Sequence, residues 1–185
     1  MAKKKCLVFE TLGKVSDLNL IKESADGFMR LHGVFGVCGV RNNNQRVYET
    51  SNYSKMVSEM QERIKSEGGI PGELEHPQQM NITLENVSHK IESIEMNEDG
   101  TITGTIVLLN TPKGKIAQAI AEAAGSLYIS SRGAGSIDES GNVTLTTIKT
   151  YDLVGTPGFS QAKLNLAKGQ TLESLNESLE DGNLM

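Results

Sequence analysis

Histidine is the side chain best suited to act as a general base near neutral pH, and this sequence has three. His32 lies in an apolar run typical of a strand, and His89 lies in an alternation of apolar and polar residues, so both patterns favour structural roles. His76 differs because it lies in residues 72–77, a short segment with two glutamates that is too charged to be core. Catalytic residues are often found on such loops. The sequence therefore favours His76 as the base.

A histidine base needs a nucleophile to activate, and residues 130–135 (Ser-Ser-Arg-Gly-Ala-Gly) offer two hydroxyl groups. Ser130 and Ser131 follow an apolar strand. Backbone N–H groups near Gly133 could approach a developing oxyanion closely, because glycine carries no side chain. This chemistry is that of a serine hydrolase. An ordinary strand end followed by a glycine-rich turn explains the same residues, so this motif alone assigns no nucleophile.

Glu73, Glu75 and His76 could instead be metal ligands, which makes a metal-dependent hydrolase a weaker alternative. Catalytic zinc commonly takes three protein ligands, often with two histidines, and the sequence has no HExxH or CxxC spacing. Cys6 and Cys38 lie in apolar stretches, which favours buried thiols in a reducing compartment over a disulfide framework. We therefore expect neither a metal nor another cofactor.

The composition excludes further classes of protein. The chain has 185 residues and a formal net charge of -5 with only 4% aromatic residues, which disfavours nucleic-acid binding. The apolar run after the lysines at positions 3–5 is too short for a signal peptide, and no run of about 18 apolar residues exists, so we expect no membrane span. We expect one domain over residues 1–168, followed by an acidic, flexible tail over residues 169–185.

Hydropathy patterns predict a strand-rich domain with two main helices. One helix is expected over residues 52–67, and a second begins at Thr111 and Pro112. The apolar stripe predicted for the second helix consists of Ile116, Ala119, Ile120 and Ala123. The predicted strands cover residues 6–9, 31–40, 87–95, 101–109, 127–131 and 143–154. Turn residues between several of these strands indicate hairpins, so the predicted fold class is α+β with a mostly antiparallel core.

Four segments are distinctive when taken together. Residues 41–48 are rich in asparagine and end in Arg-Val-Tyr, residues 72–77 read Gly-Glu-Leu-Glu-His-Pro, residues 129–136 contain Ser-Ser-Arg-Gly, and residues 151–157 form a strand with an acidic residue. In this order, over about residues 31–162, they closely resemble the prohead core protein proteases of T-even-like tailed phages. Members of that family are serine peptidases that trim scaffold and capsid proteins inside the immature head.

The resemblance implies a herpesvirus-protease-like fold, with a barrel-like core and flanking helices, and a catalytic histidine, serine and acid. His76 matches the family histidine. We assign Ser130 as the nucleophile because related proteases place the serine directly after an apolar strand residue, and because strand alternation puts Ser131 on the core face. Ser131 stays the alternative nucleophile. The third member is expected to be Asp152, where relatives carry an acid or a second histidine, and Glu75 is the alternative.

The resemblance also implies how the site would act. Backbone N–H groups near Gly133, with or without the Arg132 guanidinium, would stabilise the oxyanion. Arg132 could instead pair with a substrate carboxylate or a structural acid, and the sequence leaves this open. Family members cut after glutamate in an apolar-x-Glu context, and residues 175–177 fit it, so we expect self-cleavage after Glu177. A chance match in an acidic tail is the alternative.

The expected substrates are phage scaffold or core proteins and the major capsid protein, cleaved in the procapsid interior after assembly in the host cytoplasm. Association into a homo-oligomer is left open. The alternative from another class is a non-catalytic phage assembly or structural protein of related fold. Such a protein has no chemical reason to keep His76, Ser130 and Asp152 together.

Overall fold

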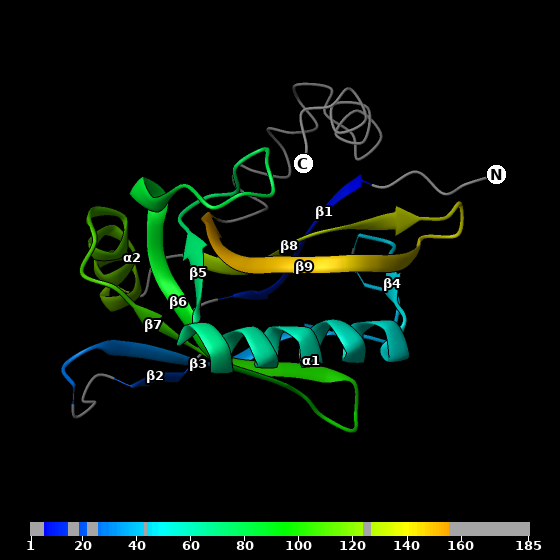
Figure 1. Cartoon of the computed structure of the whole chain (residues 1–185), viewed down its shortest axis with the longest axis horizontal. Helices are drawn as coiled ribbons and strands as arrows, with labels where there is room; N and C mark the ends of the chain where they lie inside the picture. Colours follow the sequence, from blue (N-terminus) through cyan, green and yellow to red (C-terminus); the bar gives the residue numbers. More distant parts are fainter. Residues whose placement is uncertain (1–5, 15–18, 22–25, 43, 124–126, 156–185) are drawn as a thin grey trace.

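The computed structural model describes residues 6–14, 19–21, 26–42, 44–123 and 127–155 (Figure 1). These residues form two β-sheets, two α-helices and a short 3₁₀ turn. The described ranges do not include the predicted domain boundary at residue 168 or the predicted tail over residues 169–185 with Glu177. Within the described ranges, no helix is both long enough and apolar enough to cross a membrane.

The first sheet has four strands in the order β1-β8-β9-β4. They are β1 (Cys6–Lys14), β8 (Leu127–Ile137), β9 (Asn142–Gly155) and β4 (Val47–Tyr48). β8 and β9 form the predicted hairpin, and Gly141 in its turn has a φ of 85°, a left-handed conformation that glycine adopts readily. β8 pairs antiparallel with β1 on one side and β9 on the other, so it lies inside the sheet.

The second sheet has five strands in the order β2-β3-β7-β6-β5, all antiparallel. They are β2 (Asn19–Ile21), β3 (Met29–Val37), β7 (Thr101–Leu108), β6 (Val87–Met96) and β5 (Ile70–Glu73). The predicted hairpin joins β6 to β7, and the glycine-rich strand β3 is bulged between Val34 and Gly36. β5 was not predicted, because a four-residue strand containing proline and glycine has no strand-like pattern.

The two sheets meet without closing into a continuous barrel. A parallel bridge between Leu74 and Leu153 links the chain after β5 to β9. On the other side β1 lies beside β3, but the two strands do not pair. The predicted mixture of helices with mostly antiparallel strands is confirmed. The barrel-like core is not confirmed, and the likeness to herpesvirus proteases stays a prediction.

Helix α1 (Thr50–Glu67) packs against β6 and β9 and thereby bridges the two sheets (Figure 1). Its buried face follows the predicted helical spacing and consists of Tyr53, Met56, Val57 and Met60. The helix ends at Gly68, which has a φ of 80° and donates its N–H to the carbonyl of Ile64. Helix α1 therefore covers one face of β9 and leaves the other face for the site described below.

Helix α2 (Pro112–Glu122) begins as predicted, because the Thr111 side chain accepts a hydrogen bond from the Gly114 N–H. Its predicted apolar stripe is only partly correct, since Ile120 packs against the core but Ile116 is 45% exposed. The fully buried residues of the helix are Gly114 and Ala117. A Cβ atom at position 114 would lie 1.9 Å from the Leu109 carbonyl oxygen, so the helix meets the preceding chain at a distance that only its smallest residues permit.

Candidate active site

The register between β8 and β9 brings Ser130 and Asp152 together. Ser130 lies directly opposite Asp152, and Ser131 lies directly opposite Tyr151. Directly opposed residues of an antiparallel pair project from the same face of the sheet. Ser130 and Asp152 therefore share one face, while Ser131 and Tyr151 share the other. This is the alternation on which the choice of Ser130 over Ser131 rests.

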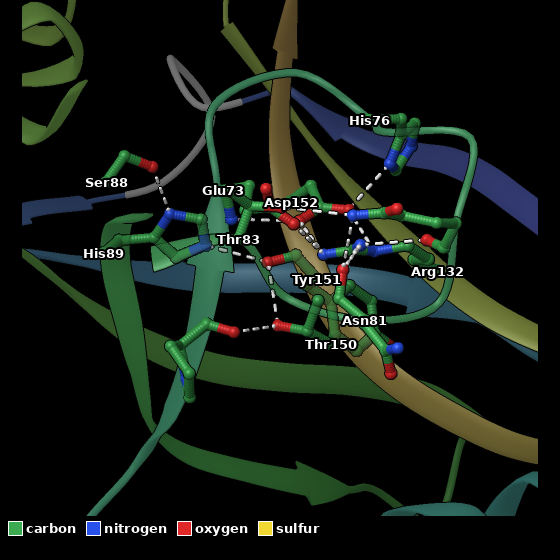
Figure 2. A network of polar contacts seen from close by, with 12 residues as sticks. Glu73, His76, Asn81, Thr83, Ser88, His89, Arg132, Thr150, Tyr151 and Asp152 are labelled. Atoms are coloured by element: carbon green, nitrogen blue, oxygen red, sulfur yellow. Dashed lines mark hydrogen bonds and ion pairs between the residues drawn. The ribbon is translucent and has the colours of Figure 1, made fainter. Parts of the chain in front are cut away.

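His76 follows β5 and reaches the face of β8 and β9 that carries Ser130 and Asp152. Figure 2 shows its contact with Asp152. Its Nδ1 lies 2.8 Å from Asp152 Oδ2, and its Nε2 lies 2.6 Å from Ser130 Oγ. A carboxylate only accepts hydrogen bonds, so Nδ1–H donates to Asp152 and the lone pair on Nε2 accepts from the Ser130 hydroxyl. The structure thus brings the three predicted residues into one hydrogen-bonded chain, in which Asp152 contacts the ring.

Glu75 turns the chain immediately before His76. Its φ is 71°, a conformation that is uncommon for residues other than glycine, and its side chain is exposed. The backbone N–H of Glu75 donates to the Leu153 carbonyl at 2.7 Å, which anchors the turn to β9. Such backbone conformations persist where the surrounding structure holds them, and they are found often at functional sites. This bend directs His76 toward β8 and β9.

Ser131 lies on the opposite face of β8, beneath helix α1. Its hydroxyl hydrogen-bonds with Tyr53, whose own hydroxyl meets that of Tyr151. All three side chains are buried, and burial raises the pKa of Tyr53 and of Tyr151. Ser131 thus belongs to a polar contact between helix α1 and the sheet, whereas His76 hydrogen-bonds to Ser130 and Asp152 on the other face of β8.

Arg132 and Glu73 form a buried ion pair next to Asp152 (Figure 2). Nη2 of Arg132 lies 2.8 Å from Glu73 Oε2 and 3.0 Å from Asp152 Oδ1, and Nε lies 3.0 Å from Asp152 Oδ2. Nη1 donates to the carbonyl oxygens of Gln79 and Asn81 at 3.0 and 3.3 Å. The Arg132 side chain is fully buried. Of the roles that the sequence left open for Arg132, these contacts support pairing with structural acids.

Gly72 and Glu73 correct the prediction that residues 72–77 lie outside the core. Both residues are buried and belong to β5. A Cβ atom at Gly72 would lie 2.2 Å from His89 Nε2 and 2.5 Å from the Tyr151 carbonyl oxygen. The glycine is therefore required by close packing rather than by a turn. The prediction of exposure was wrong because it relied on charge. In sequence, a glutamate that pairs with a buried arginine cannot be told from a glutamate in a surface loop.

Gly133 lies inside β8, which continues to Ile137 and does not end in a glycine-rich turn. A Cβ atom at Gly133 would lie 2.6 Å from the Thr147 carbonyl oxygen of β9. The pairing of β8 with β9 shifts register immediately before Gly133. This glycine thus allows β9 to bulge close to β8, three residues after Ser130. Its role in binding an oxyanion stays a prediction.

The other two histidines occupy positions consistent with the structural roles predicted for them. His89 is fully buried on β6, where Nε2–H donates to the Tyr151 carbonyl at 2.8 Å and Nδ1 accepts from the Ser88 hydroxyl at 2.7 Å. Burial lowers the pKa of His89, so its ring stays neutral. His32 is exposed on β3 and hydrogen-bonds to Thr105 through Nδ1.

We expect His89 to make the folded state less stable as the pH falls. Unfolded His89 would bind a proton below about pH 6.5, whereas buried His89 resists protonation because its folded pKa is lowered. The free energy of unfolding should therefore fall below pH 6.5, by up to about 1.4 kcal/mol per pH unit from this group. Urea denaturation of His89→Gln from pH 7 to pH 5 should show a weaker dependence. The exposed His32→Gln variant is the control, and an equal change in both would contradict the prediction.

The asparagine-rich segment over residues 41–48 binds a buried carboxylate on β1. Glu10 is only 2% exposed and is opposite Ser131 in the register of β1 and β8. Its carboxylate accepts hydrogen bonds from the side chains of Asn42, Asn44, Arg46 and Tyr48. This motif therefore fixes β1 against the strand that carries Ser130, from the far face of the sheet. Sequence patterns had no means of finding Glu10, since a single acid in an apolar strand has no periodic signal.

The carboxylates at the site contact an arginine, an arrangement typical of ion pairs rather than of a metal site. Glu73 and Asp152 both face Arg132. Across the described ranges, no group of three or more histidine, cysteine, aspartate or glutamate side chains is arranged to hold a metal ion. Cys6 and Cys38 are buried free thiols, as predicted.

Comparison with known proteins agrees with this architecture. The structure is similar to that of the capsid assembly protease of bacteriophage T4, gp21, with a TM-score of 0.72 and 21% sequence identity over 83% of this chain and 99% of that chain. No curated protein matches the sequence. The sequence model of the Peptidase S80 family matches residues 5–184. The resemblance to phage prohead proteases is thus confirmed, and the chain belongs to the peptidase S80 family.

Proposed function

We propose that this protein is a serine endopeptidase that processes scaffold or core proteins and the major capsid protein inside a phage procapsid during head maturation. The observation that carries the proposal is the hydrogen-bonded chain from Asp152 through His76 to Ser130. Membership of a peptidase family and a fold shared with a capsid assembly protease support it. The enzyme would act in the procapsid interior, after assembly in the host cytoplasm.

In the first step Ser130 Oγ forms a bond to the scissile carbonyl carbon while its proton passes to His76 Nε2. The carbonyl electron pair moves to oxygen, and Asp152 stabilises the imidazolium through Nδ1–H. The carbon–nitrogen bond then breaks, and Nε2–H gives its proton to the leaving amine. Water attacks the remaining ester by the same route and regenerates Ser130.

The oxyanion requires donors that the serine itself does not provide. Backbone N–H groups of residues 131–133 stay the candidates, because they adjoin Ser130 on β8. Loss of one such donor typically costs about 3 kcal/mol in the transition state. The Arg132 guanidinium is committed to Glu73 and Asp152, which favours a supporting role for it.

Cleavage is proposed to occur after glutamate in an apolar-x-Glu context, including self-cleavage after Glu177, a residue outside the described ranges. The same triplet pattern ends at Glu122 in helix α2 and at Glu139 in the turn after β8. Cleavage within helix α2 requires local unfolding, because a protease binds its substrate in an extended conformation. We therefore expect folded protein to be protected at Glu122.

Incubation of the purified protein with a phage scaffold protein should test the function directly. We expect mass spectrometry to find new C-termini at glutamates that follow an apolar residue two positions earlier, and a shortened form of the enzyme that ends at Glu177. Both products should be missing with Ser130→Ala, because the acyl-enzyme cannot form. Cleavage that persists with Ser130→Ala would indicate a contaminating protease. An inert wild-type protein that assembles into particles with its scaffold would favour the non-catalytic assembly protein.

A further inference from the structure

Orienting Asp152 does not by itself explain why a second buried carboxylate, Glu73, pairs with Arg132. Asp152 Oδ1 already accepts the backbone N–H of Glu73 at 2.9 Å, in addition to Nη2 of Arg132. Its Oδ2 faces both His76 Nδ1 and Arg132 Nε, and the contact with Nε is close without being a hydrogen bond. The Asp152 carboxylate is thus held on both oxygens. The Glu73 side chain needs a separate explanation.

The charges of this buried cluster do not cancel. Two carboxylates, Glu73 and Asp152, face one guanidinium, Arg132, and all three side chains are buried. Glu73 Oε1 lies in the interior without a hydrogen-bond partner in the structure. A buried, unpartnered carboxylate oxygen is costly, and each such group in a native protein calls for an explanation. Counted with both carboxylates ionised and His76 neutral, the four side chains have one more negative than positive formal charge.

Proton transfer from Ser130 to His76 would remove this imbalance. The imidazolium adds one positive charge next to Asp152, so the group of four side chains becomes neutral when the base is protonated. Because the cluster is buried, solvent and salt screen this interaction weakly. Glu73 therefore supplies the second negative charge that the imidazolium offsets, and it is linked to Asp152 through Arg132.

Arg132 connects Glu73 to the residues that position His76. Its guanidinium contacts Glu73 and Asp152 on one side and the carbonyl oxygens of Gln79 and Asn81 on the other. Those carbonyls belong to the connection between His76 and the 3₁₀ turn η2 (Leu84–Asn86). One buried side chain thus fixes both the acid and the segment that carries the histidine (Figure 2).

We propose that Glu73 and Arg132 are positioning residues of the proposed peptidase: Arg132 holds Asp152 and the His76 segment in place, and Glu73 leaves one excess negative charge that stabilises the His76 imidazolium. This rests on the proposed function, since it assigns roles within the same reaction. The charged or titratable groups around His76 come from several elements. They are Asp152 on β9, Arg132 on β8, Glu73 on β5, the neutral His89 on β6 and the exposed Glu75 in the same segment.

The test is the pH profile of peptide cleavage by Glu73→Gln, which keeps an oxygen for Arg132 but removes the charge. We expect the acid limb of kcat/KM to move to lower pH by about one unit and kcat to fall about tenfold, with KM within about twofold of the wild type. Glu73→Asp, which keeps the charge, should leave the acid limb in place. A purely structural role would lower the active fraction without moving the limb, and that result overturns the proposal.

Glu75→Gln is the matched control, because it removes a carboxylate adjacent to His76 in sequence but exposed to solvent. We expect it to move the acid limb by no more than about 0.3 pH units and to lose even this shift in high salt. The Glu73→Gln shift should persist in high salt because the group is buried. Equal shifts from the two variants would show that burial plays no part, and would overturn the proposal.

A second measurement avoids reliance on a variant that could fail to fold. The carbon-13 signal of the Glu73 side-chain carboxyl in the wild-type protein should report the ionised form at pH 7, and a protonated carboxyl there would overturn the proposal. The two hypotheses fail separately. If Ser130→Ala keeps its activity, the proposed function is wrong; if Ser130→Ala is inactive but Glu73→Gln matches the wild type, only the roles of Glu73 and Arg132 are wrong.

Discussion

Ser130→Ala is expected to lower kcat/KM for a scaffold-derived peptide by about 10⁴-fold or more, whereas Ser131→Ala should stay within a few-fold of the wild type. The physical reason is the direction of the two side chains. Ser130 Oγ lies 2.6 Å from His76 Nε2, and Ser131 hydrogen-bonds with Tyr53 on the other face of β8. Removing the Ser131 hydroxyl should instead lower the free energy of unfolding by about 1 kcal/mol, through loss of a buried hydrogen bond.

Steady-state kinetics and labelling with a reactive-serine probe, followed by peptide mapping, measure these effects. We expect the label on Ser130 and none in Ser130→Ala or His76→Ala. Because nucleophile and base act as a unit, the double variant of Ser130 and His76 should be no slower than either single variant. A label on Ser131, or near-normal turnover by His76→Ala, would contradict the assignment.

Gly72→Ala is expected to have the largest effect on stability, lowering the free energy of unfolding by about 3 kcal/mol or more. The new Cβ atom would lie 2.2 Å from His89 Nε2 and 2.5 Å from the Tyr151 carbonyl oxygen, which is the pair that hydrogen-bonds in the folded protein. Either β5 must move away from β9 or that hydrogen bond must break. Movement of β5 would also displace Glu73, so the folded fraction should lose peptidase activity.

Gly27→Ala is the matched control for Gly72→Ala. Gly27 has a φ of 79° and no atom within 4 Å of a Cβ built on it, so alanine there meets only the cost of a left-handed conformation, about 1 kcal/mol. Equilibrium unfolding in urea, with activity measured on the same samples, compares the two variants. Losses of equal size would show that close packing at position 72 is unimportant.

Periodic patterns predicted the local elements well. Helix α1 and the β6–β7 hairpin match their predicted bounds within two residues, because their signals are a repeated apolar spacing and a short turn. The same patterns placed the start of α2 but not the centre of its buried face, where Gly114 approaches the Leu109 carbonyl closely. A pattern that weighs residues by hydrophobicity does not register that a small residue can be the one closest to the core.

The candidate site was also predicted in part. Sequence alone favoured His76. With the family resemblance it named Asp152 and preferred Ser130, while Ser131 stayed the alternative. It missed that Glu73 is buried, because charge in a short segment predicts exposure, and it left the partner of Arg132 undecided.

What the sequence by itself determined is a short list of candidate side chains, His76 and the two serines, and the opposite strand faces of Ser130 and Ser131, since these follow from residue type and from a period of two. Only the tertiary structure decided that Ser130 is opposite Asp152, that the chain turns at Glu75 to bring His76 to them, and that Glu73 pairs with Arg132. Strand register, a left-handed turn and a buried ion pair each depend on residues distant in sequence, and no local pattern encodes them.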